Sequence, residues 1–145
     1  MNFIDPSARI DPSVRIWHFA VVLADVILEP EVVIGSRVEV GRGSHIGYGT
    51  HIGSGTFLPA DSDIGAGVFI GPNVTFTDDR YPAAGAPRYD AEPPVVGEYA
   101  SIGAGAVILP GVTIGAFAVI GAGTIVTRSV LPHEKIYNHL TFRSE

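Results

Sequence analysis

Large apolar residues recur at every sixth position through the first half of the chain. Stepping by six from Ile4 meets Ile4, Ile10, Ile16, Val22, Leu28, Ile34, Val40, Ile46, Ile52, Leu58, Ile64, Ile70 and Phe76. A period of six fits neither the 3.6-residue repeat of an α-helix nor the two-residue alternation of a simple strand. It indicates a short strand followed by a tight corner, repeated along the chain.

Two further columns accompany the large apolar residues. The position two residues earlier is small or β-branched, as at Ala20 and Val38, and glycine often follows the large residue, as at Gly35 and Gly53. We expect the first two columns to face inward and glycine to relieve the corner. Three such segments close a triangular coil of about 18 residues, and coils stack at about 4.8 Å. The pattern therefore predicts an all-β, parallel β-helix of about six triangular coils.

The six-residue register breaks after Thr77 and resumes at Val96, which leaves about fourteen extra residues between them. The intervening segment is polar, proline-rich and charged, so it cannot pack inside the triangle. We predict a β-helix domain over residues 1–131 with a protruding loop at about 77–95, and a short C-terminal tail over 132–145. Long excursions from a regular scaffold usually carry function.

Composition and charge narrow the classes of function. The absence of cysteine excludes a disulfide framework and a thiolate metal site. The net charge of −6 argues against a nucleic-acid or anionic-membrane surface. The start of the chain lacks the pattern of a signal peptide, and no apolar run is long enough to span a bilayer. We therefore expect a cytoplasmic protein without nucleic-acid or membrane partners.

Three segments carry a resemblance to a known family: Trp17-His18-Phe19, the stretch 71–82 that includes Phe-Thr-Asp-Asp-Arg-Tyr-Pro, and the repeat over 102–115. Over roughly residues 4–130 the chain resembles the hexapeptide acyltransferases, and within them the sugar-nucleotide 3-N-acetyltransferases. This resemblance implies a left-handed β-helix and a homotrimer with active sites between subunits. It also implies acetyl-CoA as co-substrate and the amino group of a dTDP- or UDP-linked amino sugar as acceptor.

The resemblance also implies where acetyl-CoA binds. The matching pantetheine-contacting residues are small and lie at two successive corners, with a nearby cation for the CoA phosphates: Gly103, Ala104, Gly121, Ala122 and Arg128. The alternative interpretation is that the small residues only satisfy the geometry of the corners.

The loop carries the residues that we expect to hold the acceptor. Hexapeptide O-acetyltransferases resemble one another in placing a His before Pro here, as the base that a hydroxyl needs. This chain has Arg80 and Tyr81 before Pro82, and we assign both to substrate binding. Asp78 and Asp79 are candidates to hold a sugar amine during direct attack on the thioester. Asp78 stands where the subgroup usually has Asn, and its alternative role is a turn acid.

Three histidines are further candidates. The resemblance makes His18 a candidate for the nucleotide or sugar site, with a structural role as the alternative. His45 and His51 each precede an inward residue, so we expect them on the outer wall, on different faces, as catalytic or orienting groups. The spacing of the three does not match the closely paired histidines of the hexapeptide carbonic anhydrases, so no metal is expected.

Two other functions stay open. The residues after Arg128 depart from the family's usual closing turn and helix, which leaves open a non-catalytic β-helix that binds a nucleotide sugar or supports an enzyme partner. The third option is a hexapeptide O-acetyltransferase, which the missing His-Pro pair disfavours.

Overall fold

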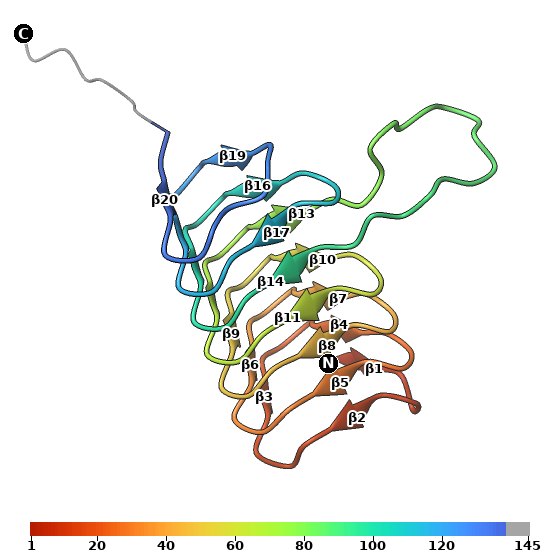
Figure 1. The fold of residues 1–145 in the computed structure, drawn as a ribbon. Helices are drawn as coiled ribbons and strands as arrows, with labels where there is room; N and C mark the ends of the chain where they lie inside the picture. The colour runs from red at the N-terminus through yellow and green to blue at the C-terminus, as the bar shows by residue number, and fades with distance from the viewer. Residues whose placement is uncertain (139–145) are drawn as a thin grey trace, which may run out of the picture.

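The computed structural model describes residues 1–138, which fold as a left-handed parallel β-helix with no α-helix. Twenty two-residue strands in this part of the chain form three parallel sheets, the walls of a triangular solenoid (Figure 1). None of these residues forms a helix long and apolar enough to cross a membrane.

Each sheet collects every third strand. Sheet A contains β1 (Phe3–Ile4), β4 (Val21–Val22), β7 (Glu39–Val40), β10 (Phe57–Leu58), β13 (Thr75–Phe76), β16 (Val107–Ile108) and β19 (Ile125–Val126). Sheet B contains β2 (Arg9–Ile10), β5 (Ile27–Leu28), β8 (His45–Ile46), β11 (Asp63–Ile64), β14 (Val95–Val96) and β17 (Thr113–Ile114). Sheet C contains β3 (Arg15–Ile16), β6 (Val33–Ile34), β9 (His51–Ile52), β12 (Phe69–Ile70), β15 (Ser101–Ile102), β18 (Val119–Ile120) and β20 (Lys135–Ile136).

The predicted inward columns form the core. The large residues from Val22 to Phe76 and from Val96 to Val126 are buried, as are the smaller residues two positions before them. Most polar members of the second column are hydrogen-bonded, whereas the buried hydroxyl of Thr124 has no hydrogen-bond partner among residues 1–138. The Thr50 hydroxyl donates to the Gly65 carbonyl at 2.7 Å and accepts the Val68 N–H at 3.0 Å. The six-residue pattern therefore identifies the buried residues, because only one side of each strand faces the core.

The solenoid has about seven turns, so the prediction of about six coils was too low. The difference lies at the C-terminal end, where the expected tail contributes β20, paired with β18. The last coil is two residues shorter than the others. Val130 bridges Ile114, and Ile136 pairs with Ile120, at 16 residues in place of 18. Residues 139–145 of the predicted tail lie outside the described part of the chain.

The predicted loop is confirmed. It leaves the solenoid after β13 in sheet A and returns at β14 in sheet B, and Figure 1 shows it projecting from the side of the coil stack. Asp63 pairs with Val95 across the insertion, so the coils above and below the loop stay in register.

The three corners of the triangle are named here by the sheets they join. The AB corner contains residues 42–43, 60–61, the loop, 110–111 and 128–129. The BC corner contains 48–49, 66–67, 98–99, 116–117 and 132–133, and the CA corner contains 36–37, 54–55, 72–73, 104–105 and 122–123. The second residue of most of these turns has positive φ, both at glycines and at larger residues such as Asp61 and Tyr99.

Candidate functional site

One arginine ties the loop to the solenoid. Arg80 Nε donates to Glu92 Oε2 at 2.7 Å, and Arg80 Nη2 donates to the Pro110 carbonyl at 3.0 Å in the next coil of the AB corner. The Glu92 N–H donates to the Asp78 carbonyl at 2.8 Å, which joins the two stems of the loop. Arg80 is therefore held by the protein itself, and its charge is matched by Glu92.

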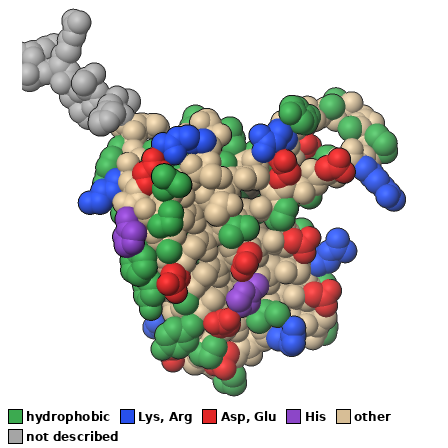
Figure 2. All heavy atoms as spheres, in the orientation of Figure 1, with side chains coloured by type: hydrophobic (Ala, Val, Ile, Leu, Met, Phe, Trp, Pro, Cys, Tyr) green, Lys and Arg blue, Asp and Glu red, His purple; other side chains and the backbone are tan. Residues whose placement is uncertain are grey.

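The loop encloses a cavity of about 330 Å³. Its lining mixes acids, arginines and tyrosines: Asp79, Arg80, Tyr81, Arg88, Tyr89, Asp90 and Glu92. Figure 2 shows acidic and basic side chains gathered on this projection. Because three carboxylates face two guanidinium groups, the lining carries a small excess of negative charge, which suits a ligand with a positive group.

The two aspartates at the start of the loop have different surroundings. Asp79 Oδ1 accepts the Tyr81 N–H at 3.0 Å and lines the cavity, whereas the side chain of Tyr81 is 83% exposed. The Tyr89 hydroxyl donates to Asp78 at 3.3 Å, and the negative charge of Asp78 raises the pKa of Tyr89. Asp78 thus fixes the far side of the loop as well as its own turn.

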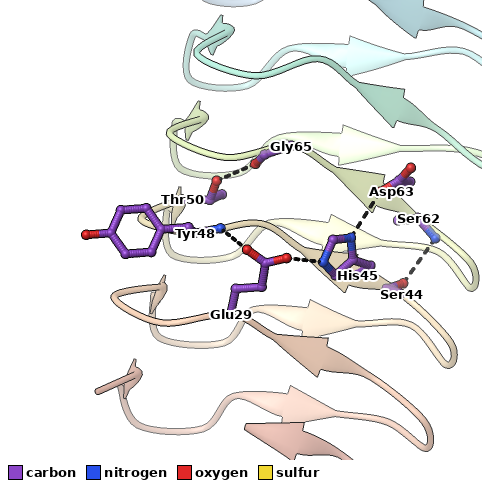
Figure 3. A network of polar contacts seen from close by, with 8 residues as sticks. All are labelled: Glu29, Ser44, His45, Tyr48, Thr50, Ser62, Asp63 and Gly65. Carbon is purple, nitrogen blue, oxygen red and sulfur yellow. Dashed lines mark hydrogen bonds and ion pairs between the residues drawn. The ribbon is translucent and has the colours of Figure 1, made fainter. Parts of the chain in front are cut away.

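His45 is the centre of a polar network on the outer face of sheet B (Figure 3). Its Nε2 lies 2.6 Å from Glu29 Oε1, and its Nδ1 lies 3.3 Å from Asp63 Oδ1. The other oxygen of Glu29 accepts the Tyr48 N–H at 2.8 Å. Glu29, His45 and Asp63 come from three successive coils, so the network is produced by coil stacking.

The hydrogen bonds of this network favour the charged forms of His45 and Glu29. Burial acts to lower the pKa of His45, but the hydrogen bonds to Glu29 and Asp63 outweigh it, and the pKa is raised. The pKa of Glu29 is lowered, chiefly by its hydrogen bond to His45 and then by the Tyr48 N–H. The Glu29 contact is short and fixed, whereas the Asp63 contact is longer, so Nδ1 is the nitrogen that another ligand could reach.

The other two histidines lie elsewhere. His51 is on sheet C, the different face that the sequence predicts, and its ring lies 5.8 Å from that of Phe69. His18 lies at the N-terminal end of the CA corner, with its ring 6.3 Å from that of Phe19. Neither has an acidic partner in the described part of the chain, so His45 differs from both.

The small residues predicted to contact pantetheine lie together on the two C-terminal coils of the CA corner. A β-carbon on Gly103 would lie 2.4 Å from the backbone nitrogen of Ala122, so this glycine has a packing role. Beside Gly103 and Gly121, Gly105 and Gly123 have positive φ and no neighbouring atom within 4 Å of a built β-carbon. Ala104 and Ala122 complete this surface, in which the backbone is almost bare.

Arg128, the predicted cation for the CoA phosphates, lies at the AB corner one coil beyond Pro110. Its Nη2 donates to Glu134 Oε1 at 2.7 Å, and its Nη1 donates to the Ser129 carbonyl at 3.0 Å. Its charge is therefore largely matched within the chain.

The structure brings the predicted residues together in separate groups. Asp78, Asp79, Arg80 and Tyr81 share the loop at the AB corner, and the four small residues share the CA corner. Sheet A lies between these two corners. Within residues 1–138 no three His, Asp or Glu side chains are grouped to hold a metal ion.

Several residues of these sites were missed by the sequence analysis. Asp63 lies one coil after His45, so the 18-residue spacing could have revealed that pair. Glu29 lies 16 residues before His45 and has no such signal. The cavity residues Arg88, Tyr89, Asp90 and Glu92 are in an irregular loop, where no period predicts which side chains meet.

Comparisons with known proteins agree with this architecture. Residues 93–128 match the family described as bacterial transferase hexapeptide (six repeats). No protein with a curated description matches the sequence.

Among solved structures, the polySia specific acetyltransferase NeuO is 23% identical with a TM-score of 0.73, over 91% of this chain and 68% of that one. A galactoside acetyltransferase in complex with coenzyme A is 29% identical with a TM-score of 0.64, over 86% of this chain and 60% of that one. A perosamine N-acetyltransferase from Caulobacter crescentus, in complex with CoA and GDP-perosamine, is 28% identical with a TM-score of 0.38, over 94% of this chain and 53% of that one.

These similar proteins are acetyltransferases, and the chain spans roughly half to two thirds of their length. The repeat of six, the triangular solenoid and the match over residues 93–128 agree with one another. The chain is thus a left-handed β-helix of hexapeptide repeats that is similar in fold to these acetyltransferases, and its residues 93–128 match the bacterial transferase hexapeptide family.

Proposed function

We propose that the protein is an acetyl-CoA-dependent N-acetyltransferase acting on the amino group of a dTDP- or UDP-linked amino sugar. The observation that carries the proposal is the bare CA corner of the two C-terminal coils, formed by Gly103, Ala104, Gly121 and Ala122. The similarity to a galactoside acetyltransferase that binds coenzyme A supports the same donor here.

The CA corner suits the thin pantetheine arm of acetyl-CoA. Gly105 and Gly123 present no side chain, so a ligand can approach the backbone closely. The polar amides of pantetheine would pair with main-chain groups of the two turns. The equivalent positions of the earlier coils hold Phe19, Arg37, Gly55 and Asn73. Gly55 lies against the Asn73 side chain, so two successive glycines with open space beside them occur at this corner in the last coils.

The loop cavity suits the amino sugar. Its acidic excess, with Asp79 beside Tyr81, would hold a sugar that carries an ammonium group. An ammonium has no lone pair, so one proton must leave before the reaction. The neutral nitrogen then attacks the thioester carbon, the C–N bond forms as the C–S bond breaks, and the second proton goes to the CoA thiolate.

His45 is the residue we assign to take the first proton. In its neutral form, with Nε2–H donating to Glu29, its Nδ1 carries the lone pair. Asp63, on the next strand of sheet B, would attract the ammonium towards Nδ1. The loop rejoins sheet B at Val95, the strand neighbour of Asp63, so His45 lies two strands from the base of the loop.

The active site is shared between copies in this proposal. The loop lies at the AB corner and the bare surface at the CA corner, with sheet A between them. One copy would supply the acceptor cavity and its neighbour the CoA surface, which is the homotrimer that the resemblance implies.

Calorimetry of CoA binding, combined with an acetyl-transfer screen of dTDP- and UDP-linked amino sugars, tests the proposal. Gly105→Phe places a ring on the CA corner at a positive φ that phenylalanine already adopts at position 117. We expect this variant to lose CoA binding. Arg37→Phe is the matched control, because it places the same ring at the same corner and a similar φ in an N-terminal coil. A wild-type protein that binds no CoA would overturn the proposal in favour of a non-catalytic β-helix.

One observation favours a second candidate, an O-acetyltransferase. A hydroxyl needs a general base to attack a thioester, and the His45–Glu29 pair is such a base with an orienting carboxylate. The same screen with unmodified sugars separates the two candidates, since only an O-acetyltransferase would acetylate sugars that lack an amine.

A further inference from the structure

Three arginines lie in the described part of the loop and the C-terminal coils, and their surroundings differ. Arg80 is paired with Glu92, and Arg128 is paired with Glu134, each at 2.7 Å. Arg88 lines the loop cavity and forms no ion pair in this part of the chain. A guanidinium group is always charged and carries five N–H donors. Arg88 is therefore the arginine whose charge is left for a ligand.

Two aspartates of the cavity are likewise without an opposite charge. Asp79 accepts the Tyr81 N–H through Oδ1, at 3.0 Å, and Asp90 lines the same cavity. Neither aspartate forms an ion pair within residues 1–138. Because Arg80 and Glu92 neutralise each other, the cavity is left with one unmatched cation and two unmatched carboxylates. A ligand that carries both a positive and a negative group would match both kinds of charge.

The unmatched charges lie at different distances from the solenoid. The two limbs of the loop are joined at its base, where the Glu92 N–H donates to the Asp78 carbonyl at 2.8 Å. The loop turns at its tip over residues 83–86, which a backbone hydrogen bond of 3.2 Å closes. Asp79 directly follows the joint at the base, whereas Arg88 lies on the returning limb just after the tip. The cavity therefore has a carboxylate at its base and its free cation towards the tip.

This order of charges matches a nucleotide-linked amino sugar. Its ammonium group would lie at the base of the cavity beside Asp79, and the far side of the sugar would lie near Arg88. In such an acceptor the far side carries the diphosphate, whose oxygens suit the two parallel N–H bonds that a guanidinium group donates. A free amino sugar has no anion at this place and would leave Arg88 unmatched.

We infer that Arg88 binds the diphosphate of the acceptor and is the residue that selects nucleotide-linked amino sugars over free ones. The inference rests on the proposed function, because it takes the ammonium group of the acceptor to lie at Asp79. The two arginines of the loop then have different roles. Arg80 holds the loop to the solenoid through Glu92 and Pro110, and Arg88 contacts the acceptor.

Steady-state kinetics with three forms of one amino sugar tests the inference. The forms are the nucleotide-linked sugar, its 1-phosphate and the free sugar, each with acetyl-CoA as donor. Arg88→Gln removes the charge and the paired N–H donors with little change in size. We expect its kcat/KM to fall at least about tenfold for the two phosphorylated acceptors, through a higher KM, because a hydrogen bond between charged groups is lost. The value for the free sugar should stay the same.

Two further variants are controls for this experiment. Arg88→Lys keeps the charge but not the planar pair of donors, so it should keep part of the preference for phosphorylated acceptors. Arg42 is exposed at the same AB corner but lies outside the cavity, and Arg42→Gln should leave the kinetics of all three acceptors unchanged. An equal loss on the three acceptors would make Arg88 a structural residue. That result, or the absence of any loss on the phosphorylated acceptors, would overturn the inference.

Calorimetry without acetyl-CoA separates the inference from the proposed function. UDP and dTDP contain the diphosphate but lack the amino sugar, so their binding does not depend on acetyl transfer. We expect the wild-type protein to bind one of them, and Arg88→Gln to bind it at least about tenfold more weakly. Equal affinity of the two proteins, or no binding of either nucleotide, would overturn the inference. The proposed function fails on a different result, the absence of acetyl transfer to every amino sugar.

Discussion

Two corners of the same solenoid expose different kinds of surface in the C-terminal coils. In the C-terminal coils the CA corner carries Gly105 and Gly123, and the BC corner carries Tyr99 and Phe117. All four residues have positive φ, between 55° and 68°, so the backbone turns are nearly alike. The difference lies in the side chains alone, since one corner exposes bare main chain and the other a stack of rings.

The comparison teaches that positive φ does not by itself identify a position that needs glycine. At Gly105 a β-carbon would meet open space, and at Phe117 a whole ring is accommodated. Gly103 is different, because the neighbouring coil lies directly against it. Contact between coils, more than the turn conformation, decides where glycine is indispensable. Glycine at a position with open space is then available for a ligand.

The largest expected effect on stability comes from substituting two glycines that are two residues apart. The pair separates the cost of contact between coils from the cost of positive φ. Gly103→Ala should cost about 3 kcal/mol in the free energy of unfolding, because its β-carbon would meet backbone that cannot move aside. Gly105→Ala should cost about 1 kcal/mol, for the positive φ alone. Urea denaturation measures both, and equal costs would show that turn conformation dominates.

The next largest expected effect is on acetyl transfer, and it comes from a substitution in the loop. Arg80→Gln removes both the contact to Glu92 and the contact to Pro110, so the cavity loses its anchor to the solenoid. We expect acetyl transfer to fall about tenfold, because misplacing bound groups is costly in rate, while thermal stability changes little.

Arg88→Gln is the control for that experiment. Arg88 lines the same cavity and has no ion pair among residues 1–138. It should change the KM for the acceptor without the loss in kcat. A variant at Arg80 with wild-type kcat/KM would contradict the role of this arginine as the anchor of the loop.

The smallest effect is a pH dependence of stability from sheet B. Because the pKa of His45 is raised, its contribution is complete below its ordinary value of 6.5 and is lost as pH rises through the folded pKa. Because the pKa of Glu29 is lowered, its contribution is present above 4.5 and is lost as pH falls through the folded pKa. The pair therefore stabilises most between these two transitions.

NMR titration of the His45 ring checks this directly. Glu29→Gln removes the carboxylate that holds the imidazolium, so the pKa of His45 should fall. If the alkaline rise in acetyl transfer moves to lower pH together with it, His45 is the proton acceptor. An unmoved profile beside a shifted pKa would leave His45 a structural residue.

Much of the fold could be predicted from sequence because each coil repeats the interior of the coil before it. Every inward residue, such as Ile46 and Ile102, meets the same environment one coil above and below, so a single period describes the whole core. The loop was located because Val96 returns to that period. The last coil was not predicted, because a turn shorter by two residues shifts Val130 and Ile136 out of the register that was being followed.

The candidate sites were less predictable because they depend on neighbours across coils. His45 and Asp63 lie 18 residues apart, so this contact could be inferred from the column that contains them. Arg80 and Glu92 meet inside an irregular loop, where only the folded backbone determines which side chains approach. The contrast between the CA and BC corners likewise appears only when the turn residues are compared coil by coil.

The central claim is that the CA corner of one copy and the loop of another form one acetyltransferase site. Refolding a mixture of Gly105→Phe and Arg80→Gln chains tests it most directly, because each variant damages a different half of the site. We predict that the mixture recovers about a quarter of wild-type acetyl transfer, since that share of the boundaries would join two intact halves. A mixture no more active than the two variants measured separately would contradict the claim.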